Sequence, residues 1–277
     1  MADDMDCKRP INNAFSRQKW GTIAWHSMSN WDAMSIQMVW FASDARRANA
    51  AKLYSTFVGT DPDSFQSSKV PTPPIPNLSA ASGNVGDRTY SVTVQPSRVD
   101  LVVQRANDVG SDLPDLLSNP DQIILELASK AALIGAELSS VSRLALVTTL
   151  YRPTDSHAAA NEIVAGMVGL ELPRSDVTDL AFQVNARVPL DSTSGVVVNR
   201  FLKFGVAAFH SVTFDFANQA IANRNVETFG ANLVVDVNIV PHFQPLTPEL
   251  QSQIWTKLAD ETAVVRSTGT LGSLWHA

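Results

Sequence analysis

Polar residues that alternate with apolar ones along two strand-like segments are the positions of this sequence best suited to bind a ligand. Asn185 and Arg187 occupy the polar side of one segment, and Asp236 and Asn238 occupy the polar side of a later one. If the two segments meet in one sheet, Arg187 and Asp236 can form a charge-assisted hydrogen bond. The four residues are either the solvated side of a half-buried sheet, which is the commoner arrangement, or a polar pocket or docking face.

Tryptophans near the N-terminus give a second candidate site. Four of the six, Trp20, Trp25, Trp31 and Trp40, lie close together in the sequence. Dense aromatic side chains are typical of protein interfaces and of surfaces that stack nucleic-acid bases. The same residues would also suit the core of a first hairpin. The cluster therefore predicts either an interaction surface or core packing, of which core packing is the simpler interpretation.

Patterns of known catalytic chemistry are missing from the sequence. It contains no G-x-S-x-G, G-x-x-x-x-G-K-[ST] or G-x-G-x-x-G motif, which disfavours α/β-hydrolases, P-loop NTPases and dinucleotide enzymes. The five histidines lack zinc-site spacing, and the single Cys7 excludes a thiolate cage. His242 stands at a strand end where a general base can sit, but a loop histidine bonded to backbone is the simpler interpretation. We therefore predict no catalytic residue, no cofactor and no metal site.

The overall composition is that of an ordinary globular protein. The chain has 277 residues, 45% of them hydrophobic and 17% charged, and a net charge of -6. No apolar run approaches the roughly 20 residues of a membrane span, so no membrane association is expected. The acidic balance disfavours nucleic acid as a partner. The lone cysteine and the absence of an apolar signal segment favour the cytoplasm.

Local patterns predict an alternation of strand pairs and helices. In the first half we expect a hairpin of 22–28 with 35–42, a helix over 44–58, a proline-rich loop over 59–87, a hairpin over 90–103 and a helix starting at the capping Asn119. In the second half we expect a strand over 143–151, a helix from Thr154, strands over 180–190, 196–216 (broken or bulged at Gly205) and 229–240, and a terminal helix from Thr247.

This order of elements predicts the fold class. Hairpins without intervening helices require antiparallel pairing, and the helices between them must cover one face of the sheet. We therefore predict an α+β protein, with a largely antiparallel sheet covered on one face by about four helices. Residues 1–20 are expected to form a flexible N-terminal arm and 21–277 a single domain, with two subdomains (21–152 and 153–277) as the alternative. No internal repeat is visible in the sequence.

The same order of elements resembles that of a sporadically distributed family of uncharacterised bacterial proteins. The resemblance lies in the strand over 143–151 after a long helix and in the closing strand 233–239 before a terminal helix. It brings no catalytic motif with it. The resemblance implies a bacterial, cytosolic protein.

These observations lead to two functional expectations. The first is a non-catalytic protein-binding or accessory subunit of a bacterial or phage-related complex, with another protein or a second copy of the chain as its partner. The alternative is a small-ligand-binding module or enzyme, with a pocket between the antiparallel sheet and the C-terminal helix. In that alternative the ligand is held by Asn185, Arg187, Asp236 and Asn238. Nucleic acid is the less favoured partner in either case.

Overall fold

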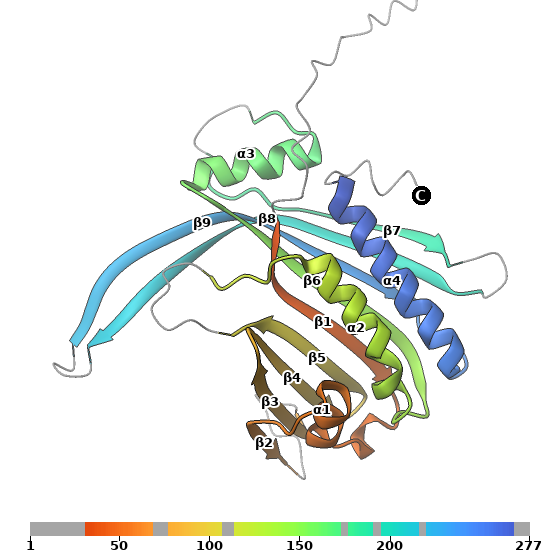
Figure 1. Cartoon of the computed structure of the whole chain (residues 1–277). Helices are drawn as coiled ribbons and strands as arrows, with labels where there is room; N and C mark the ends of the chain where they lie inside the picture. Colours follow the sequence, from red (N-terminus) through yellow and green to blue (C-terminus); the bar gives the residue numbers. More distant parts are fainter. Residues whose placement is uncertain are drawn as a thin grey trace, which may run out of the picture.

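The computed structural model describes residues 31–68, 77–106, 114–172, 177–190, 195–215 and 220–268, with the backbone alone for 210–215, 220–227 and 268. This part of the chain forms one sheet with helices packed on it (Figure 1). The strands are β1 (Asp32–Ala42), β2 (Ser64–Ser67), β3 (Ser79–Val85), β4 (Arg88–Gln95), β5 (Arg98–Arg105), β6 (Val141–Thr154), β7 (Phe182–Pro189), β8 (Val197–Asp215) and β9 (Ala220–Ile239). The helices are α1 (Ala50–Val58), α2 (Pro120–Gly135), α3 (His157–Val168) and α4 (Pro248–Thr268), with a short 3₁₀ helix, η2 (Ala45–Arg47).

The nine strands form a single antiparallel sheet in the order β2-β3-β4-β5-β1-β6-β9-β8-β7. Side chains alternate between its two faces, and buried residues of all four α-helices join those of the strands in one hydrophobic cluster. The helices therefore cover one face. The predicted α+β class, with an antiparallel sheet covered on one face by four helices, is confirmed.

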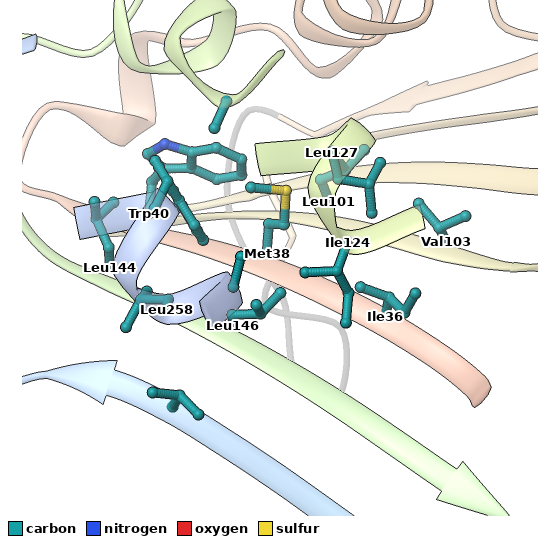
Figure 2. Close-up of a cluster of buried hydrophobic side chains, with 14 of the residues drawn as sticks. Ile36, Met38, Trp40, Leu101, Val103, Ile124, Leu127, Leu144, Leu146 and Leu258 are labelled. Atoms are coloured by element: carbon teal, nitrogen blue, oxygen red, sulfur yellow. The ribbon is translucent and has the colours of Figure 1, made fainter. Parts of the chain in front are cut away.

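The centre of the core lies where β1 and β6 meet α2 and α4. Figure 2 shows Met38 and Trp40 of β1 facing Leu127 of α2 and Leu258 of α4. Trp40 also contacts Trp255 of α4, with ring centroids 4.9 Å apart. Because α4 is the last helix and β1 the first strand, these contacts join the two ends of the described chain.

The chain repeats one order of elements. Its first half runs β1, α1, β3, β4, β5, α2 with the short β2 inserted, and its second half runs β6, α3, β7, β8, β9, α4. From the centre of the sheet outward, β1-β5-β4-β3 on one side corresponds to β6-β9-β8-β7 on the other. The halves are thus alike in topology although no repeat is visible in the sequence, and they share one sheet and one core.

Helices with a clear apolar stripe lie where the sequence predicts them. The buried residues of α2 include Ile123, Leu127 and Ala131, and those of α4 include Ile254 and Leu258. The start of α2 differs in one detail. The sequence predicts Asn119 as the capping residue, but its backbone is left-handed (φ 54°) and its side chain makes no capping hydrogen bond.

Two predictions for the first half are wrong. Segment 22–28 lies outside the described residues, but its expected pairing with 35–42 is excluded, because β5 and β6 occupy both edges of 35–42 in β1. The expected loop over 59–87 contains β2 and β3. Its residues are small because α1 packs closely there: a Cβ at Gly83 would lie 2.7 Å from the Tyr54 hydroxyl, and the Ser79 hydroxyl accepts from the Ala50 amide.

Two further predictions for the second half hold only in part or not at all. The α3 stripe expected from spacing is Ala159, Ile163, Met167 and Leu170. Of these, Ile163 and Met167 are half-buried against the core and Leu170 is exposed, whereas the residues that α3 buries fully are Ala160, Asn161, Val164 and Ala165. The helix is turned this way because the Asn161 amide binds the backbone of Val177 and Leu180, just before β7. The break or bulge expected at Gly205 is absent, since Gly205 pairs in register with Asn232.

β8 and β9 continue past the end of the sheet as a two-stranded ribbon, which we define as residues 208–215 and 220–229. β6 ends at Thr154, opposite Phe229, and beyond that point β8 and β9 pair only with each other in the described chain. Figure 1 shows the ribbon projecting away from the helices. At its base Tyr151 lies against Gly230, where any side chain would collide with its ring, and meets Phe209 edge-on. Within the described ranges, the ribbon is thus anchored to the rest of the sheet at its base.

A buried ion pair lies between β8 and α4. Arg200 and Glu261 are 2% and 3% exposed, and the Arg200 Nη2 lies 2.5 Å from the Glu261 Oε2. Lys257 Nζ binds the other carboxylate oxygen at 2.7 Å. Burial alone would raise the pKa of Glu261, but the hydrogen bonds from Arg200 and Lys257 outweigh it and hold that pKa below its ordinary value. The stability from Glu261 is therefore complete above its unfolded-state pKa and is lost as the pH falls through the lower folded-state pKa.

This arrangement predicts the effect of removing one or both charges. Arg200→Met leaves Glu261 buried without its main partner and should lower the free energy of unfolding by about 3–5 kcal/mol. Adding Glu261→Leu should restore much of that loss and flatten the decline of stability in acid, because no buried charge remains. Urea titrations at neutral and acidic pH measure both effects. A double variant no more stable than Arg200→Met would contradict this account.

Candidate functional site

Asn185, Arg187, Asp236 and Asn238 all belong to the side of the sheet opposite the helices, which we call the helix-free face. No helix in the described ranges covers it. The strand register places Arg187 opposite Asn199 and Asn199 opposite Asn238. Because side chains alternate, the residues beside them in β9 point into the core instead.

Arg187, Asn238 and Asp236 are joined, through Asn199, by a chain of side-chain hydrogen bonds. We call these four residues the amide relay. The Arg187 Nε donates to the Asn199 Oδ1 at 3.0 Å, and the Asn199 Nδ2 donates to the Asn238 Oδ1 at 3.0 Å. The Asn238 Nδ2 then donates to the Asp236 Oδ1 at 2.8 Å. Asn238, at the middle of the relay, is only 4% exposed. The relay holds these polar groups in fixed positions.

The relay replaces the direct contact that the sequence suggested. β8 lies between β7 and β9, which separates Arg187 from Asp236 by two strand spacings, or about 10 Å. The two residues are therefore linked by hydrogen bonds through Asn199 and Asn238 and form no ion pair. Asn185 lies on the same face and is exposed, opposite Phe201, and no hydrogen bond of the described chain joins it to the relay.

The relay continues onto β6 and β1. The Arg143 Nη2 of β6 donates to the same Asn238 Oδ1 at 3.0 Å. The Arg143 guanidinium also packs over the ring of Phe41, with 4.8 Å from its central carbon to the ring centroid, and Arg98 of β5 packs on Phe41 at 5.3 Å. The Arg98 Nε and Nη2 both bind the buried Asp100 carboxylate. A polar row thus crosses the sheet from β5 to β7.

The pocket expected under the C-terminal helix is not formed by these residues. Asn185, Arg187, Asp236 and Asn238 lie on the face turned away from α4, because they alternate with the residues that α4 covers. Under α4 the described chain fills the space with apolar side chains and with the Arg200–Glu261 pair. The predicted location is therefore wrong, and a ligand or partner of these residues would meet them from the helix-free side.

The tryptophans divide between the core and the part of the chain that the structure does not describe. Trp40 and Trp31 are 0% and 2% exposed. Side chains buried to this extent offer no surface to a partner, so the core-packing interpretation holds for both. Trp20 and Trp25 lie outside the described residues, and an interface there stays a prediction.

Other candidate chemistry is sparse in the described ranges. The His242 Nδ1 lies 2.8 Å from the backbone oxygen of Gln244, as expected of a loop histidine. No group of three or more metal-binding side chains is found among the residues described. A polar hollow of about 230 Å³ beside the start of α2, lined by residues such as Arg88 and Gln122, is smaller than typical ligand pockets. None of the described helices is long and apolar enough to cross a membrane.

No protein-family model, no curated protein and no solved structure matches this chain. The resemblance to a sporadically distributed bacterial family therefore stays a prediction. The function has to be argued from the site itself.

The polar row is suited to binding, because its donors and acceptors are already held in place. Its β7 and β9 residues are predicted from the sequence, whereas Asn199, Arg143 and Phe41 are not. Asn199 and Arg143 do alternate with buried residues of their strands, so period-two alternation could have placed both on the side of the sheet opposite the core. Their contact with Asn238 depends on strand order, which alternation does not reveal.

Asn238 should matter for stability more than its neighbours on the same face. Asn238→Ala removes the acceptor of Arg143 and Asn199 and the donor to Asp236, which should lower the free energy of unfolding by about 1–3 kcal/mol. Asn185→Ala is the matched control and should change it by less than about 0.5 kcal/mol. Urea denaturation followed by tryptophan fluorescence measures both. Equal losses in the two variants would show that the relay contributes nothing of its own.

Proposed function

We propose that this chain is a non-catalytic binding subunit of a bacterial or phage-related complex in the cytoplasm, and that its partner protein docks on the helix-free face. The main support is the polar row from β5 to β7. Its side chains are fixed by one another, so a partner that binds them pays little conformational entropy. Arginine outnumbers lysine by 14 to 7 in the sequence, a usage common in GC-rich bacterial genomes.

The ribbon of β8 and β9 also supports a protein partner. Beyond the sheet, the outer edges of its two strands have no ladder partner within the described ranges. An isolated two-stranded ribbon is marginally stable in water, and free strand edges are templates for pairing with another chain. A second copy of this chain carries matching free edges, so self-association through the ribbon is part of the proposal.

A pair of matched substitutions tests the docking face. Thr149→Arg places a bulky charge in the middle of the helix-free face, on β6, whereas Thr256→Arg adds the same side chain to the exposed surface of α4. We expect a partner that co-purifies with the tagged chain from its own organism to be lost with Thr149→Arg and kept with Thr256→Arg. Thermal melts confirm that both variants fold.

Two outcomes would overturn the proposal. One is a chain that co-purifies with no partner, stays monomeric and turns over a substrate. The other is a partner that both variants retain equally, since that partner would bind elsewhere.

Shortening the ribbon tests its separate role. Removing 211–226 and closing the strands with Asn-Gly, a favoured two-residue hairpin turn, should leave the melting temperature within a few degrees, because the removed part forms no ladder with the rest of the sheet. Size-exclusion chromatography with light scattering should show an assembly for the full chain and a monomer for the shortened one. A full chain that is monomeric at high concentration would contradict self-association through the ribbon.

A further inference from the structure

Three cations of the helix-free face lack acidic partners. No carboxylate of the described residues lies within 4.0 Å of Arg143, Arg187 or Lys203. On the same face Arg98 is paired with Asp100. In the rest of the described chain most cations are paired with carboxylates: Lys52 with Glu137, Arg88 and Lys130 with Glu126, Arg200 and Lys257 with Glu261, and Arg266 with Asp121. Arg98, Arg143, Arg187 and Lys203 therefore outnumber the two carboxylates of this region, Asp100 and Asp236, and leave it net positive on a protein whose net charge is -6.

Of the three cations, Arg143 is the one with a buried nitrogen that has no hydrogen-bond partner among the described residues. Its Nε is fully buried and has no hydrogen-bond acceptor within the described chain. Its Nη2 shares the Asn238 Oδ1 with Asn199, and one side of its guanidinium packs on Phe41. A cation held in this way is partly desolvated without the compensation of a negative charge. The Arg143 Nη1 makes no hydrogen bond in the described chain and is not fully buried, so it is the nitrogen that an incoming oxyanion can reach.

We propose that the helix-free face binds an acidic segment of a partner protein, with one carboxylate bound to Arg143 and a second bound to Arg187. This rests on the proposed function and specifies its partner. Arg187 is exposed and uses only its Nε, on Asn199, so its two terminal nitrogens can form a fork with a carboxylate. Arg143 and Arg187 are three strand spacings apart, or about 14 Å, a span that an extended segment of a few residues covers.

A polypeptide fits this face better than a nucleic acid. Single-stranded nucleic acids are bound by a broad positive field and by exposed aromatic rings on which bases stack. Here Phe41 is already in contact with Arg98 and Arg143, and Asp236 lies among the cations. A few separated carboxylates match a few fixed arginines, whereas a continuous phosphate chain would also meet Asp236 and the acidic surface of the whole protein.

The test uses the full chain and a labelled synthetic peptide of alternating Glu and Ser, with a Gln-Ser peptide of equal length as the uncharged control. In an extended peptide this alternation places the carboxylates on one side. Fluorescence anisotropy should show binding of the Glu-Ser peptide that weakens with added salt, and no binding of the Gln-Ser peptide. Labelled oligo-dT is the third probe.

Variants assign the binding to the two arginines. Arg143→Gln should weaken binding by about ten-fold or more, the loss expected for a charge-assisted hydrogen bond, and Arg187→Gln should weaken it several-fold. Arg46→Gln is the control, because Arg46 is an exposed cation on η2, outside the helix-free face. Arg187 is exposed, so Arg187→Gln tests the proposal even if Arg143→Gln fails to fold.

Three results would overturn the proposal. They are equal binding of the Glu-Ser and Gln-Ser peptides, an Arg187→Gln variant that binds like the wild type, and tighter binding of oligo-dT than of the Glu-Ser peptide. The co-purification test separates this failure from that of the proposed function. A partner lost with Thr149→Arg but kept with both arginine variants would leave the docking face in place and remove only the acidic segment.

Discussion

The antiparallel pairing of β1 with β6 is the interaction on which the rest of the structure depends. It joins two halves of like topology into one sheet, and it places Trp40 where α4, at the far end of the chain, can pack on it. With both edges of its central strands occupied, the sheet can grow only outward, through β5 on one side and β9 on the other. The two longest described helices then meet over this centre, so a single core serves both halves. A boundary between two subdomains would have to cut through this core.

Covering only one face of a sheet has a direct chemical consequence. Side chains alternate, so every strand that contributes to the core must present its other side chains to the opposite face. Here those side chains include Arg143, Asn199 and Asn238, which bind one another because adjacent strands bring them within hydrogen-bond distance. The same proximity limits how well each charge is compensated: Asn238 offers one amide oxygen to two donors, and the Arg143 Nε has no acceptor within the described chain. The side chains of this face are therefore held in place, but Arg143 lacks, among the described residues, a negatively charged partner that a bound protein could supply.

The elements that the sequence predicted well are those with strong patterns. The stripes of α2 and α4 and the alternation of β7 need only local backbone geometry, and each is present in the structure. The weak predictions have physical reasons. β3 has small residues because Gly83 and Ser79 lie against α1, and small residues in sequence look like a loop. α3 is rotated because Asn161 is anchored to the segment before β7, and that long-range hydrogen bond outweighs a small difference between two helix faces.

By itself, the sequence determined which residues share a side of each element, because periods of 2 and 3.6 follow from the geometry of strand and helix alone. It thereby placed Arg187 and Asp236 among the polar residues of their strands. Only the tertiary structure decided which of these polar residues meet. In the sheet β8 lies between β7 and β9, so Asn199 links Arg187 to Asn238. β6, which is distant from β9 in the sequence, is its neighbour in the sheet, and this brings Arg143 to Asn238. Strand order depends on the packing of the whole sheet under its helices, and no local pattern records it.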